Sequence, residues 1–74
     1  MIRLRAKTSD AVLDASQVRR VRFLLLEFLP AVRCQVSQGP GIAIVVSDRN
    51  REDLTEALQR RIEEIIGCQL VEDD

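Results

Sequence analysis

The side chains of this chain that could carry chemistry are two cysteines, twelve carboxylates and eleven cations, while histidine, tyrosine and tryptophan are absent. Histidine is the side chain that most often transfers protons near neutral pH, so the commonest acid–base group is missing. The chain has no Cys-x-x-Cys pair and no GxxxxGK[ST] phosphate loop. Glu56, Glu63 and Glu64 are interpreted as solvated helix surface. We therefore expect no enzymatic activity, no cofactor and no metal.

The two cysteines fall in phase with apolar residues of expected strands, Cys34 with Val32 and Val36, and Cys68 with Leu70. Cysteine is among the most buried residue types, so both are interpreted as core residues. In the fold derived below they lie at opposite edges of a sheet, three strand spacings of about 4.8 Å apart. A disulfide needs Cα atoms within about 7 Å, so the sequence predicts no intrachain disulfide.

Alternation of apolar and basic residues predicts a first strand over residues 1–7. An apolar spacing of three to four residues then predicts a helix that ends before Pro30, with Leu25 and Phe28 on its core side. The helix begins near Ser9 or as late as Ser16. The spacing favours helix over residues 9–15, and a short strand over residues 11–13 is the alternative.

The second half of the chain predicts two strands, a helix and a last strand. Residues 32–36 alternate, Gly39-Pro40-Gly41 forms a turn, and residues 42–47 are apolar on both faces, as expected of a central strand. Asp48 or Asn50 is expected to cap the second helix, and Gly67 to end it. Residues 68–72 complete the pattern as a short strand. We expect a single domain over residues 1–74, with residues 72–74 as a frayed tail.

The element order β-α-β-β-α-β predicts an α+β fold. Right-handed crossovers place the first and third strands in the middle of a four-stranded antiparallel sheet, with both helices on one face. This arrangement is the ferredoxin-like sandwich. A chain of 74 residues has a thin core, and self-association is one way in which such small domains gain stability.

Charge is divided unevenly between the two halves of the chain. Residues 1–37 carry seven cations and three anions, whereas residues 38–74 carry four cations and nine anions. Such asymmetry indicates a charged partner or self-association. The exposed face of the predicted sheet would carry the candidate polyanion-binding residues Arg3, Arg5, Lys7 and Arg33. Both aromatic residues belong to the first helix, so this face lacks the rings on which RNA bases stack.

Apolar residues outside the core stripe give a second candidate surface. Phe23, Leu24 and Leu26 extend the apolar surface around the first helix, and Val45 and Val71 add a patch on the sheet face. No apolar run approaches the ~20 residues of a membrane span, and no signal region is seen. The sequence thus predicts a cytoplasmic, non-enzymatic protein-interaction or regulatory module that forms homo-oligomers or binds another protein. The alternative is a domain that binds RNA or another polyanion weakly.

Overall fold

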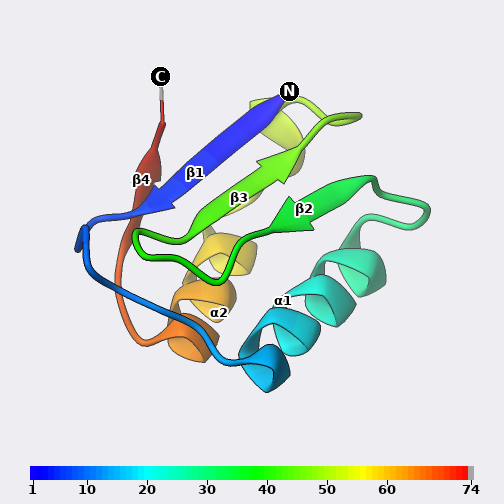
Figure 1. The fold of residues 1–74 in the computed structure, drawn as a ribbon. Helices are drawn as coiled ribbons and strands as arrows, with labels where there is room; N and C mark the ends of the chain where they lie inside the picture. The colour runs from blue at the N-terminus through cyan, green and yellow to red at the C-terminus, as the bar shows by residue number, and fades with distance from the viewer. Residues whose placement is uncertain (74) are drawn as a thin grey trace.

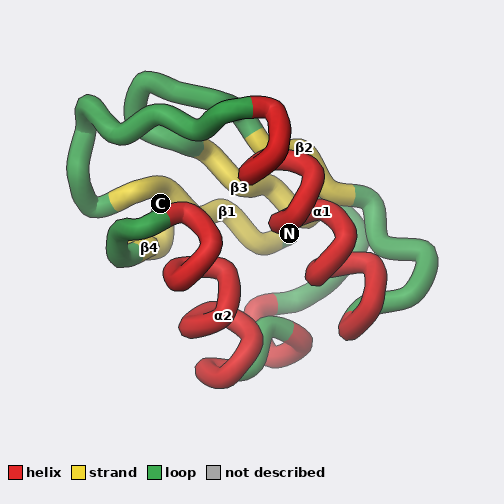
Figure 2. The backbone as a smooth tube through the Cα atoms, turned by 90° about the horizontal axis from the view of Figure 1, so that it is seen from below, coloured by secondary structure: helices red, strands yellow, loops and turns green. Residues whose placement is uncertain are grey.

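The computed structural model describes residues 1–73, and it shows two α-helices and a four-stranded antiparallel sheet (Figure 1). The α+β class predicted from the sequence is therefore confirmed. Both helices lie on the same face of the sheet, as the view from below also shows (Figure 2). The elements are β1 (Ile2–Ala6), α1 (Ala15–Phe28), β2 (Cys34–Val36), β3 (Ala43–Val46), the 3-10 helix η1 (Arg51–Asp53), α2 (Glu56–Ile66) and β4 (Leu70–Glu72).

The strands lie in the order β2-β3-β1-β4, so β2 and β4 are the two edges of the sheet (Figure 1). β1 shows why the register is well defined. Leu4 lies opposite Ile44 and is buried under the helices, whereas Arg3 lies opposite Val45 and is exposed on the other face. A shift of one residue would exchange these two environments, and burying the arginines would be costly.

α1 begins at Ala15, so the favoured start near Ser9 is wrong, and the later start at Ser16 is within one residue of the boundary. Asp14 caps the helix: its carboxylate accepts a hydrogen bond from the Gln17 N–H at 2.7 Å. The Gln17 side chain in turn accepts from the Asp14 N–H at 3.0 Å. This reciprocal pair satisfies two backbone donors at the start of the helix, which places the boundary here.

Residues 11–13 lie beside the loop between β2 and β3. The Leu13 N–H donates to the Gln38 carbonyl at 2.7 Å, and the Gly41 N–H donates to the Ala11 carbonyl at 2.8 Å. Leu13 is buried, so it reaches the core without being helical. The alternative of a short strand over residues 11–13 is also wrong, because no strand is formed there.

α2 begins at Glu56, later than the predicted caps at Asp48 and Asn50. Thr55 is the cap, and its hydroxyl accepts from the Leu58 N–H at 3.2 Å. The acidic residues before it form the separate helix η1 instead of a first α-helical turn. The end of α2 is as predicted, because Gly67 adopts the left-handed conformation with φ of 79°.

β4 is shorter than the predicted strand at residues 68–72, and Cys68 precedes it. Glu72 lies opposite Leu4 in the sheet, so the predicted frayed tail is wrong at this residue. The Asp73 N–H continues the pairing by donating to the Arg3 carbonyl at 3.0 Å. The part of that prediction that concerns Asp74 lies outside the described residues.

The core lies between the sheet and the two helices. Its fully buried residues include Leu4 and Ile44 from the sheet, Leu25 from α1 and Ile62 from α2. The accessible surface is 4814 Å² for a chain of 8.4 kDa. A compact monomer of this mass is expected to expose about 4,600 Å², so one copy of the chain already buries its surface well.

Candidate functional site

Helix α1 exposes apolar side chains on the side away from the core. Phe23 is 64% exposed and Leu26 is 45% exposed, as the sequence indicated. Leu24 was predicted to belong with them, but it is only 6% exposed and packs in the core. Phe28 was expected in the core and is 47% exposed, with the Arg61 guanidinium 5.5 Å from its ring centre. The core stripe of α1 is therefore rotated relative to the predicted one.

The exposed apolar residues of α1 line a groove that continues to the edge strand β2. One hollow of about 360 Å³ lies along the helix, and a second of about 570 Å³ extends to the start of β2. Arg22 and Leu26 line both hollows, so the two are adjacent, and together they are here called the α1–β2 groove. Its lining residues are Ala15, Val18, Arg19, Arg22, Phe23, Leu26, Val32, Arg33, Cys34 and Gln35, with Met1, Val45 and Ser47 at the sheet end.

The outer edge of β2 presents unpaired backbone groups. The Ser37 N–H donates to the Ala43 carbonyl at 2.9 Å, and the Ser47 N–H donates to the Arg33 carbonyl at 3.0 Å. Backbone direction alternates along an antiparallel strand, so the N–H and C=O of Cys34 and Val36 point away from the sheet. Within residues 1–73, no side chain bonds to these four groups. β2 is therefore an open edge, of the kind that can pair with another strand.

The opposite edge, β4, is partly closed by side chains of α2. The Leu70 N–H donates to the Glu63 carboxylate at 2.7 Å, and the Leu70 carbonyl accepts from the Gln59 amide at 3.3 Å. Glu72, next along this edge, forms an ion pair with Arg51. Glu63 is therefore partly buried. Its interpretation from the sequence as solvated helix surface is wrong, and its structural role was not predicted. The two edges of the sheet therefore differ within residues 1–73: β2 has two residues with free backbone groups, Cys34 and Val36, beside an apolar groove, whereas β4 has one such residue, Glu72.

The predicted polyanion-binding residues lie on the open sheet face but do not form a purely cationic cluster. Arg3, Arg5, Lys7 and Arg33 are exposed. Asp73 approaches Arg5 at 3.9 Å, and both side chains are half exposed, so solvent screens this ion pair strongly.

Half-buried apolar residues lie between the cations of this face. Val45 is opposite Arg3, and Val71 is opposite Arg5. Both valines were predicted to contribute to self-association. Neither is among the large apolar side chains that are strongly exposed, so the groove offers more apolar contact than this face does.

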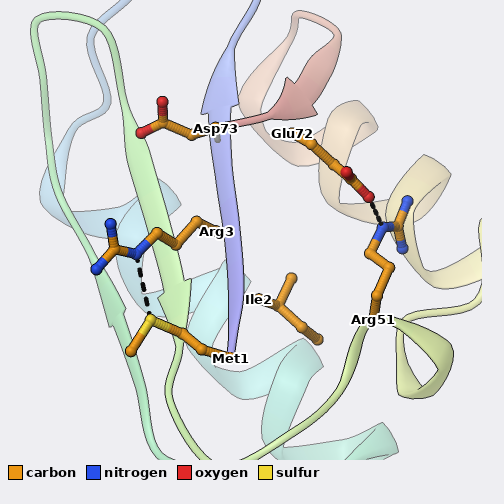
Figure 3. A pocket seen from close by; sticks show the side chains of 6 residues that line it. All are labelled: Met1, Ile2, Arg3, Arg51, Glu72 and Asp73. Atoms are coloured by element: carbon orange, nitrogen blue, oxygen red, sulfur yellow. Dashed lines mark hydrogen bonds and ion pairs between the residues drawn. The ribbon is translucent and has the colours of Figure 1, made fainter.

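A third hollow, of about 350 Å³, lies around the N-terminal end of β1 (Figure 3). Its lining includes Ile2 and Asp73, and its other side chains are paired within the protein. Arg3 donates to the Met1 sulfur at 3.2 Å on one side of the strand, and the Arg51–Glu72 pair lies on the other (Figure 3). Arg51 also donates to the Leu54 carbonyl at 3.1 Å. These contacts join η1 to β4 and to Leu54, which precedes α2, so the polar side chains around this hollow take part in contacts that hold the fold together.

Two ionisable groups, Cys34 in the groove and Asp48 beside Arg33, have shifted pKa values. Burial raises the pKa of the Cys34 thiol, and the nearby Arg22 guanidinium opposes this only in part. The thiol is therefore mainly protonated at neutral pH and a poor nucleophile. Asp48 accepts the Arg33 N–H at 2.9 Å, and this bond lowers the pKa of its carboxyl. Cys34 and Cys68 are both free, and no metal-binding group of three ligand residues occurs in the described part of the chain.

Comparison with known proteins gave no relatives: no family model, no curated protein and no solved structure matches this chain. Among residues 1–73, no helix has the length and apolar character needed to cross a membrane.

Proposed function

We propose that this chain is a non-enzymatic protein-interaction module that binds its partner in the α1–β2 groove. The observation that carries the proposal is that Leu26 is exposed beside an open strand edge, with Phe23 exposed in the adjoining hollow along α1. A partner that covered the groove would remove apolar side chains from water and satisfy free backbone groups together. Together these features favour protein binding at the groove over the other hollows.

We further propose that the fold is a ferredoxin-like sandwich. The support is that β1 and β3 are the central strands and that both helices cover one face (Figures 1 and 2). In this arrangement β2 is an edge strand next to α1. The fold thus explains how residues 23 and 34, distant in sequence, come to line one groove.

A second copy of the chain is one protein that could occupy the groove, as the sequence suggested. Because one copy already has the surface of a compact monomer, such a dimer would form between folded monomers. Sedimentation equilibrium distinguishes a species of 8.4 kDa from one of twice that mass. A dimer that dissociates when Phe23 is replaced by serine would identify the groove as its interface.

Selection from a random peptide library tests the docking function without assuming a partner. Wild-type protein should enrich a set of related peptides, and the Phe23→Ser/Leu26→Ser variant should lose them. Val12→Ser is the matched control, because Val12 is 66% exposed and does not line the groove. Equal enrichment by all three proteins would contradict docking at the groove.

Weak polyanion binding is the second candidate, favoured by the exposure of Arg3, Lys7 and Arg33 on one sheet face. Backbone phosphates would be bound without stacking, so affinity should fall steeply with salt. Titration of labelled single-stranded RNA against wild type and Arg3→Glu/Lys7→Glu measures this. Absence of salt-sensitive binding at low ionic strength would end this proposal.

A further inference from the structure

We propose that the α1–β2 groove receives a short, acidic, extended segment of a different protein, which joins the sheet as a fifth strand beside β2. This inference rests on the proposed docking function and adds the conformation and charge of the partner. Three independent features carry it: the free edge of β2, the arginines that line the groove and the exposed apolar residues of α1.

The backbone determines where a strand can be added. The N–H and C=O groups of Cys34 and Val36 can form up to four hydrogen bonds with an extended segment. β4 offers fewer free groups, because Glu63 and Gln59 already bond to Leu70 and only the backbone groups of Glu72 face outward without a bond. Beyond Val36, the Gln38 carbonyl is occupied by Leu13. The open edge is therefore short, and it suits a segment of a few residues.

The charge of the groove determines which segment fits. Arg19, Arg22 and Arg33 line it, and in the part of the chain described here none of them is within ion-pairing distance of a carboxylate. Aspartate or glutamate on the partner would supply the missing anions. A second copy paired through β2 about a twofold axis would instead bring this arginine-lined surface against itself. Charge complementarity thus favours an acidic segment of another protein.

The exposed apolar side chains of α1 indicate which residues of the added segment should be apolar. Side chains alternate between the two faces of a strand, so every second residue of the added segment would point toward the helix layer. There it would meet Leu26 of α1, which is exposed in the free protein and lines the hollow beside β2. The residues between would point to the open face, where Arg33 and Gln35 are exposed. We infer a pattern in which apolar residues alternate with acidic ones.

Fluorescence anisotropy with designed peptides tests this inference. The probe is a labelled peptide that alternates valine with glutamate, and two control peptides carry lysine in place of glutamate or proline at the central valine. We expect the glutamate peptide to bind with an affinity that falls as salt is added, and the lysine peptide to bind at least tenfold more weakly. Proline removes a backbone donor, so it should also weaken binding at least tenfold.

Two single substitutions provide a matched pair for the protein. Arg33→Glu and Arg20→Glu change the net charge equally on exposed residues, but only Arg33 lines the groove on the face toward which the acidic residues of the segment would point. Arg33→Glu should weaken the glutamate peptide about tenfold and improve the lysine peptide, whereas Arg20→Glu should change both by less than threefold. Equal effects of the two substitutions would show that net charge, and not the groove, selects the peptide.

The outcomes separate this inference from the proposed function. Equal binding of the glutamate and lysine peptides would overturn the acidic preference, and full binding of the proline peptide would overturn strand addition; in both cases the groove remains a docking site. If the protein forms a homodimer that Phe23→Ser abolishes, the occupant of the groove is a second copy of the chain and not an acidic segment. If the protein binds RNA and Arg19→Glu abolishes that binding, the occupant is RNA. If no designed peptide binds and the random library is not enriched, both the inference and the docking function fail.

Discussion

Two leucines of α1, two positions apart, provide a direct test of which face of the helix is buried. Leu24 is 6% exposed and packs in the core, whereas Leu26 is 45% exposed and lines the groove. Replacing each with alanine removes the same atoms and changes helix propensity by the same small amount. Any difference between the two variants therefore reports on burial.

The expected loss of stability differs severalfold between these variants. Removing a buried leucine side chain to Cβ typically costs about 2–5 kcal/mol. A core of this size rarely provides more than roughly 3–5 kcal/mol of net stability, so Leu24→Ala should lose half of it or more. Full burial of leucine contributes about 1.5–3 kcal/mol, and Leu26 is only about half buried. Because alanine keeps Cβ, Leu26→Ala should lose about 1 kcal/mol or less.

Urea unfolding followed by far-ultraviolet circular dichroism measures both losses. With a slope of about 1 kcal/mol per molar urea for a small domain, Leu24→Ala should lower the midpoint by roughly 2 M or more. Leu26→Ala should lower it by about 1 M or less. Equal shifts, or a larger shift for Leu26→Ala, would refute the assignment of the buried face and with it the α1 side of the groove.

Three further predictions follow from local contacts. Asp14→Ala should cost about 0.5–2 kcal/mol in thermal unfolding because it removes the cap of α1, and Asp14→Asn should cost less; an unchanged Asp14→Ala would contradict the capping role. The hydrogen bond from the Arg33 N–H lowers the pKa of the Asp48 carboxyl in the folded state. The ionised carboxylate therefore stabilises the fold at pH values above the ordinary carboxyl pKa. This stabilisation is lost as the pH falls through the lowered pKa of the folded state. Wild type should therefore lose stability relative to Asp48→Asn as the pH falls below about 4, and an equal dependence of the two urea midpoints on pH would contradict this. Burial raises the pKa of Cys34, so iodoacetamide should alkylate it more slowly than free cysteine at mildly alkaline pH, with a rate that rises with pH; an equal rate would contradict this.

The strand faces were predictable because their pattern is local. In β1, Ile2, Leu4 and Ala6 alternate with basic residues, and only one register buries the apolar set. Gly67 ends α2, as predicted, because the left-handed backbone conformation at this position favours glycine.

The helix starts were harder to predict because several residues of the right type compete. Ser9 and Asp14 could each cap α1, and the choice depends on hydrogen bonds from residues 11–13 to a loop far along the chain. Thr55 and Asn50 compete in the same way before α2. Local propensity cannot distinguish such candidates when tertiary contacts decide between them.

The groove was only partly predictable for a similar reason. Phe23 and Leu26 were predicted to be apolar surface outside the core. Leu24 is buried and Phe28 is exposed, the reverse of the prediction, because these environments depend on how α1 is rotated over the sheet. Partial closure of the β4 edge depends on Glu63 reaching Leu70 from the neighbouring helix, and no sequence pattern indicates this contact.

The central claim, that β2 is the open edge on which a partner docks, is tested most directly by amide hydrogen exchange at Cys34 and Val36. In the free protein these two amides should exchange quickly, whereas Leu70, bonded to Glu63, should be protected. Adding the valine–glutamate peptide should protect Cys34 and Val36 and leave the other edge unchanged. Slow exchange at both amides in the free protein, or new protection that appears at β4 instead, would contradict the claim.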